Sequence, residues 1–187
     1  MPLPPSDVKR KHVHTRTITC QGFERVDGAW EVEGWITDIK TYGVDSPERI
    51  HVPPGEPMHD MGMRLTVADN MQITDTVAVQ DHSPYRICHT ITPSFRKLIG
   101  LNLTKGFRKS VRDLLGGNKG CVHLVDILGP MATTLFQTTT KRRFKQLKDA
   151  EDRGEKLRPP VINTCHAWSS DGPVVKRDFP DFYTGKS

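Results

Sequence analysis

Apolar and polar residues alternate along the first half of the chain, and this pattern predicts β-strands. The alternation over 30–36 follows the turn dipeptide Asp27-Gly28, so we expect a hairpin there. Alternation over 61–79, with a turn at Asp69-Asn70, predicts a second hairpin. Gly34 lies inside the first hairpin, where we interpret it as a β-bulge. One face of the resulting sheet is expected to be buried and the other hydrated.

The second half of the chain has the apolar spacing of helices. A short helix is expected to begin at Pro93, and a second is expected over 107–115 before Gly116-Gly117. A third predicted helix begins near Cys121, is kinked at Pro130, and continues as a charged extension over about 141–154. Strands followed by helices predict an α+β fold, with an antiparallel sheet from the N-terminal half packed against helices from the C-terminal half.

The length of 187 residues favours one domain, which we place at 13–187 after a flexible segment over 1–12. The proline-rich segment 43–57 has no periodicity, so we expect a loop that forms a rim or lid. No export signal or membrane span is apparent, and a cytoplasmic location is expected. The four cysteines form no CxxC pair, which indicates reduced thiols rather than a disulfide framework.

The net charge of +5 comes from basic blocks near the N-terminus, around the helix predicted over 107–115, and in the charged extension from Lys141. Few aromatic residues accompany these blocks, so we interpret them as solvated helix faces and expect no nucleic-acid partner. A small anionic substrate would also suit this charge. The exposed edge strands and the charged helix are also compatible with a homodimer.

No dinucleotide, Walker, zinc-protease or serine-hydrolase motif occurs, so candidate chemistry rests on polar groups beside apolar elements. His123 and Asp126 are three residues apart on one predicted helix, where the carboxylate could orient the imidazole or simply satisfy a buried polar pair. Asp60 could orient His59 for proton transfer or simply form an ion pair with Arg64. The candidate catalytic residues are His59, Asp60, Tyr85, His123, Asp126 and His166. The candidate substrate-binding residues are Arg64, Arg86, Trp35 and Tyr42.

A metal site is the alternative interpretation of the cysteines and histidines. Thiolate and imidazole are zinc and iron ligands, and the candidate set is Cys121, His123, Cys165 and His166. The spacing is weak support, because residues two apart on a helix point to different sides. The cysteines could equally be small buried apolar residues.

Six motifs together resemble a bacterial family that is catalogued as a domain of unknown function. The motifs are His14-Thr-Arg, Asp27-Gly-Ala-Trp-Glu-Val-Glu-Gly, Asp38-Ile-Lys-Thr-Tyr, His59-Asp-Met-Gly-Met-Arg-Leu-Thr, Ser83-Pro-Tyr-Arg-Ile-Cys and Gly120-Cys-Val-His-Leu-Val-Asp-Ile-Leu-Gly-Pro-Met-Ala. The resemblance implies a role in the breakdown of aromatic compounds, and specifically a lyase that eliminates formaldehyde from the side chain of lignin-derived dimers.

Such a retro-aldol-like C–C cleavage needs acid/base groups and an aromatic-lined pocket rather than a redox cofactor, so no cofactor is expected. Two other functions stay open at this point. One is a metal-dependent hydrolase or lyase that uses the Cys/His ligands. The other is a non-catalytic binding or regulatory module.

Overall fold

The computed structural model describes residues 3–46, 48–104 and 106–186. The chain divides into a first compact unit that ends at Thr138 and a second that begins at Thr139. The expectation of one domain over 13–187 therefore stays a prediction, and the two units are described separately. No helix among the described residues has both the length and the apolar character needed to cross a membrane.

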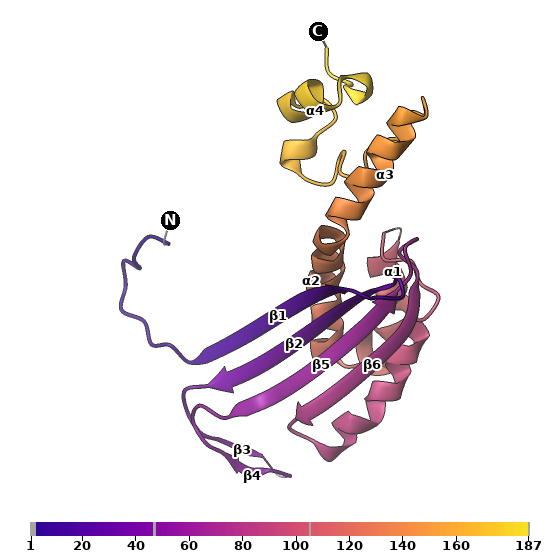
Figure 1. The fold of residues 1–187 in the computed structure, drawn as a ribbon. Coiled ribbons are helices and arrows are strands. Elements are labelled where there is room, and N and C mark those ends of the chain that lie inside the picture. Colours follow the sequence, from indigo (N-terminus) through magenta and orange to yellow (C-terminus); the bar gives the residue numbers. More distant parts are fainter. Residues whose placement is uncertain (1–2, 47, 105, 187) are drawn as a thin grey trace. The chain divides into compact units, whose positions relative to one another are not determined.

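The first unit contains a four-stranded antiparallel sheet in the order β1, β2, β5, β6. Its strands are β1 (His14–Glu24), β2 (Trp30–Lys40), β5 (Pro57–Val67) and β6 (Ile73–His82). Helices follow in the chain and cover one face, as Figure 1 shows. They are η1 (Arg86–Leu98), α1 (Phe107–Leu115), η2 (Gly117–Lys119) and α2 (Val122–Thr138), of which η1 and η2 are 3₁₀-helices. The predicted α+β fold is confirmed.

The two faces of the sheet follow from the alternation in the sequence. Along β2, Trp30, Val32 and Ile36 are buried and face the helices. Their partners on β5, among them Leu65 and Met61, are buried on the same face. We call this the inner face, and the opposite face the outer face. The inner face forms one apolar core with residues of η1, α1 and α2.

Gly34 is not a β-bulge, contrary to the sequence-based expectation. The pairing of β2 with both neighbours is continuous there, and the register shift along β2 falls instead between Asp38 and Ile39. A Cβ atom at Gly34 would lie 2.6 Å from Cγ of Met131 on α2. The glycine is therefore needed because a helix packs closely against the strand.

The helix boundaries agree in part with the prediction. Helix α1 ends at Leu115 as expected, whereas the short helix around Pro93 is a 3₁₀-helix that already begins at Arg86. Helix α2 includes Pro130 and ends at Thr138, so the expected continuous helix to residue 154 is wrong. Three consecutive threonines, 138–140, explain the break, because branched side chains and local hydroxyl bonds weaken a helix.

The second unit contains only helices and turns among its described residues. Its helices are α3 (Thr140–Asp152), η3 (His166–Trp168), α4 (Pro173–Asp178) and η4 (Pro180–Phe182). Within it, Trp168 packs against Phe179, with ring centroids 5.8 Å apart.

The segment 43–57 is not the structureless loop that its prolines predict. It contains a small hairpin of β3 (Val44–Ser46) and β4 (Ile50–Val52). Hydrogen bonds tie this hairpin to the start of η1: Ser46 Oγ donates to the carbonyl of Pro84 at 3.2 Å, and the amide of Arg86 donates to Glu48 Oε2 at 2.6 Å. The hairpin connects the end of β2 to the start of β5, and its role as a lid stays a prediction.

Candidate active site

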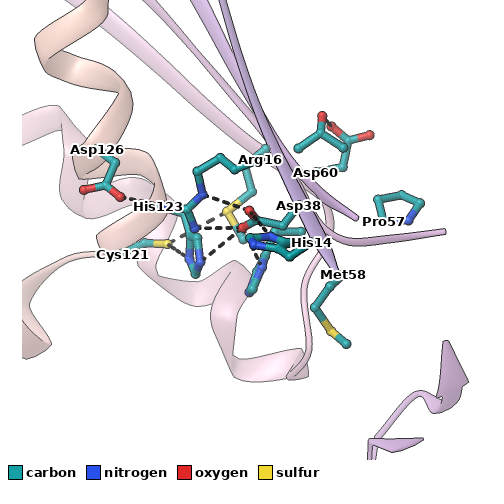
Figure 2. Close-up of polar contacts among 12 residues, drawn as sticks. His14, Arg16, Asp38, Pro57, Met58, Asp60, Cys121, His123 and Asp126 are labelled. Atoms are coloured by element: carbon teal, nitrogen blue, oxygen red, sulfur yellow. Dashed lines mark hydrogen bonds and ion pairs between the residues drawn. The ribbon is translucent and has the colours of Figure 1, made fainter. Parts of the chain in front are cut away.

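A buried carboxylate, Asp38, lies where the apolar alternation of β2 ends. It is 3% exposed, and it pairs in register with Arg16 on β1 and His59 on β5, so all three side chains share the inner face. His123 reaches the same point from the first turn of α2. Figure 2 shows His14, Arg16 and His123 gathered around Asp38. We call Asp38, His14, Arg16, His59 and His123 the Asp38 cluster.

Both oxygens of Asp38 accept charge-assisted hydrogen bonds. Oδ1 accepts from Arg16 Nε at 2.8 Å and from His14 Nε2 at 3.0 Å. Oδ2 accepts from an Arg16 terminal nitrogen at 2.9 Å and from His59 Nδ1 at 3.1 Å. His123 Nε2 makes a longer contact of 3.5 Å with the same oxygen. The carboxylate is thus held in one orientation by a two-pronged guanidinium and by imidazoles.

The ionised carboxylate fixes the tautomer of His59. A carboxylate only accepts hydrogen bonds, so Nδ1 of His59 must carry the proton that it donates. In the neutral ring the lone pair then resides on Nε2, for which no hydrogen-bond partner occurs among the described residues. Nε2 of His59 is therefore available to take a proton from a bound molecule.

Asp38 stays ionised well into the acidic range. Burial favours the neutral acid, but the hydrogen bonds and the positive charge of Arg16 outweigh that effect. Together with His14 and His59 they lower the pKa of Asp38 to about 2. The cluster therefore keeps a fixed negative charge beside a fixed positive one at neutral pH.

Both inner imidazoles are neutral at neutral pH. Burial, and after it the charge of the neighbouring His123, lower the pKa of His59 to about 4, although Asp38 acts in the opposite direction. Burial also lowers the pKa of His123. The two rings stack, with centroids 3.7 Å apart and planes 29° apart, so protonation of both at once is opposed by charge repulsion. Their side chains remain 16% and 18% exposed, so neither ring is fully closed off from solvent.

Asp126 does not pair with His123 as the sequence spacing predicts. Its carboxylate accepts from Arg16 at 2.9 Å and is 43% exposed, so it forms a second, outer contact of the guanidinium. The negative charge of Asp126 raises the pKa of His123, but less than that of Asp38 does. The carboxylate that contacts His123 is therefore Asp38, because the sheet presents it directly to the first turn of α2.

Cys121 lies beside His123, although the sequence predicted that both residues belong to one helix and point to different sides. It precedes α2, which begins at Val122, so the geometry of a helix does not direct the two side chains to different sides. Its Sγ lies 3.9 Å from Nδ1 of His123 and 3.9 Å from the sulfur of Met61. The thiol thus forms the apolar border of the cluster on the helix side.

Three other candidate residues lie on the outer face of the sheet. Asp60 accepts a hydrogen bond from Thr37 and, in Figure 2, points away from the cluster. Arg64 lies 3.7 Å from Glu33 and 3.9 Å from Glu31. Arg64 and Trp35 line a shallow groove of about 200 Å³. These residues are separated from the cluster by the sheet itself.

The remaining candidates lie at other places in the chain. Tyr85 is half exposed at the start of η1, next to Arg86, which the hairpin contacts through Glu48. Tyr42 follows β2 and lies under the ammonium group of Lys40. His166 belongs to the second unit, as does Cys165. Their proposed roles stay predictions.

Asp38, His59 and His123 each offer one ligand atom, and these atoms lie within 4.8 Å of one another. Two imidazoles bound to one ion at about 2.0–2.1 Å would hold their ring centres roughly 4.5 Å apart or more. The observed separation is 3.7 Å, and Arg16 already occupies both carboxylate oxygens. The arrangement fits a proton-transfer site better than a metal site.

His14, Arg16 and Asp38 belong to the cluster but are not among the site residues predicted from the sequence. A signal was present, because Asp38 continues the buried positions 30, 32 and 36 of β2 and places a charge on the apolar face. A charge at such a position requires partners, and these can come only from neighbouring strands or from a covering helix.

A sequence profile of the family described as "Protein of unknown function (DUF2889)" matches residues 14–137. The chain belongs to the DUF2889 family. The DUF2889 region contains every residue of the Asp38 cluster and ends at the boundary of the first unit. No curated protein matches the chain, and neither does any solved structure.

Proposed function

We propose that the protein is a cofactor-independent lyase that cleaves a C–C bond of a lignin-derived aromatic substrate by acid/base catalysis. The observation that carries this proposal is the neutral, partly accessible His59 imidazole, oriented by the buried carboxylate of Asp38. An oriented imidazole with a free ring nitrogen is a common general base.

The electrostatics of the cluster support this role. A base must be unprotonated before the reaction, and the pKa of about 4 keeps His59 neutral at pH 7. After His59 takes a proton, the imidazolium lies 3.1 Å from the Asp38 carboxylate, which stabilises the new charge. Arg16 prevents Asp38 from taking that proton itself, because it holds the pKa of the carboxyl well below its usual range.

The proposed reaction balances without a redox partner. His59 removes the proton from a primary hydroxyl group of the substrate, and the O–H electrons form the C=O bond of formaldehyde. The C–C bond breaks, and its electron pair forms a C=C bond to the adjacent carbon. The leaving group on that carbon departs with its bonding pair and receives the proton from the imidazolium.

Support for the aromatic substrate comes from the family resemblance, whereas support for acid/base chemistry comes from the geometry. The rings of His59 and His123 are planar and stacked on each other, and a planar ring face suits stacking with an aromatic substrate. A metal-dependent hydrolase or lyase is the second candidate, because three ligand atoms of Asp38, His59 and His123 lie close together.

One assay separates these candidates. Purified protein is incubated with a phenolic 1,2-diarylpropane-1,3-diol, and formaldehyde and the stilbene product are quantified with and without a strong chelator, alongside elemental analysis. We expect the two products in equal amounts, at a rate that the chelator does not change. Loss of turnover on chelation, restored by one metal, would favour the second candidate. Absence of both products would contradict the proposed reaction.

A further inference from the structure

Two buried polar side chains on the inner face of β6 have no hydrogen-bond partner among the described residues. They are Gln80, which is 7% exposed and lacks a partner at both amide atoms, and Thr76, which lacks one at its hydroxyl. An amide or hydroxyl buried in this way loses its hydration without compensation. Burying such a side chain lowers the stability of the fold, and this indicates that it has a role in binding a ligand.

The position of Gln80 links it to the Asp38 cluster. Gln80 is the β6 partner of Met61, and Met61 follows His59 by two residues on the same face of β5. Gln80 and His59 are therefore diagonal neighbours on either side of a register shift between Asp60 and Met61. In regular antiparallel pairing such neighbours lie about 7–8 Å apart. Thr76 precedes Gln80 by four residues on β6, which places it roughly 13 Å away.

We propose that Gln80 is a substrate-binding residue that recognises an un-ionised hydroxyl group, alcohol or phenol, of the molecule held at His59. This inference rests on the proposed function. A carboxamide offers a donor and an acceptor side by side, and a hydroxyl group accepts and donates in the same way. A carboxylate would leave the amide oxygen unpaired. A charged group would also be poorly solvated beside Met61, the buried partner of Gln80 on β5.

The chain offers a matched pair of variants. Gln80→Leu and Thr76→Val each remove a buried, unpartnered polar group from the same strand face, but only Gln80 adjoins the cluster. Because each variant removes an unsatisfied group, both are expected to keep the fold and to unfold at the same temperature as the wild type or a few degrees higher. Only Gln80→Leu is expected to affect ligand binding.

The probe is 2-methoxyphenol, with 1,2-dimethoxybenzene as the analogue that lacks the hydroxyl. The side-chain amide signals of Gln80 in an NMR spectrum are assigned by their absence in Gln80→Leu. We expect the phenol to shift these signals and the ether to leave them unchanged. We also expect about tenfold weaker binding of the phenol to Gln80→Leu and unchanged binding to Thr76→Val.

Unshifted Gln80 signals at millimolar phenol would overturn the inference. So would a Gln80→Leu variant that loses stability but binds the phenol normally, since that result indicates an amide satisfied by a buried water only. Failure of the proposed reaction has a different signature. A protein that binds the phenol through Gln80 but releases no formaldehyde contradicts the reaction alone, whereas unchanged formaldehyde release in Gln80→Leu contradicts the role of Gln80 alone.

Discussion

Replacement of Asp38 by Asn tests whether this carboxylate organises the site. Asn keeps one acceptor oxygen but places an NH₂ donor where the second oxygen accepts from Arg16 or from His59. A buried charge pair that loses one partner costs about 3–5 kcal/mol. Arg16 is partly exposed and keeps its contact with Asp126, so we expect the free energy of unfolding to fall by about 3 kcal/mol, at the lower end of this range.

The effect of this variant on turnover should exceed its effect on folding. Without the carboxylate, the protonated nitrogen of His59 is no longer fixed at Nδ1, and the imidazolium loses its counter-charge. Loss of an orienting aspartate beside a catalytic histidine lowers turnover by roughly a thousandfold or more in comparable arrangements. The assays are chemical denaturation followed by circular dichroism, and formaldehyde release at a temperature where the variant is folded.

Asp126→Asn is the matched control, because Asp126 also accepts a hydrogen bond from Arg16. Asp126 is 43% exposed, and exposed ion pairs contribute at most about 1 kcal/mol. We therefore expect a small loss of stability and nearly normal turnover. If Asp126→Asn lost as much turnover as Asp38→Asn, the carboxylate that orients the base would be Asp126, and the assignment of Asp38 would be refuted.

Two further predictions concern pH and packing. An NMR titration should find that His59 stays neutral until the pH approaches its pKa of about 4. Because the unfolded residue binds its proton near pH 6.5, the free energy of unfolding should fall by up to about 3 kcal/mol as the pH drops from about 6.5 to 4. If His59→Gln showed the same dependence of unfolding free energy on pH, this linkage would be contradicted. Gly34→Ala should lower the free energy of unfolding by about 1–3 kcal/mol, because its Cβ would meet Met131, and a variant as stable as the wild type in denaturant titrations would show that α2 can move away.

The sequence predicted the sheet well because each strand of the hairpins has a local signal. Alternation placed Trp30, Val32 and Ile36 on one face, and the structure buries all three. Gly34 was misinterpreted for a physical reason. A glycine in a strand is compatible with either a bulge or a close neighbour, and the neighbour, Met131, lies far away in the sequence.

The site was predicted only in part, because its geometry depends on register between distant segments. His59 and His123 were identified from their apolar surroundings. Asp38 was missed, since its importance appears only when β1, β2, β5 and α2 converge on it. Asp126 was chosen as the partner of His123 because three-residue spacing is the only relation that a single helix reveals.

The central claim is that His59, stacked against His123, transfers the proton in a C–C lyase, and the turnover of Gln variants of both residues tests it most directly. Formaldehyde release from the phenolic diol is measured for His59→Gln, His123→Gln and the control His82→Gln, which changes an exposed histidine outside the cluster. The account predicts folded variants, at least a hundredfold loss of turnover in His59→Gln, a clear loss in His123→Gln, and normal turnover in His82→Gln. Full turnover in His59→Gln, with the wild type active, would contradict it.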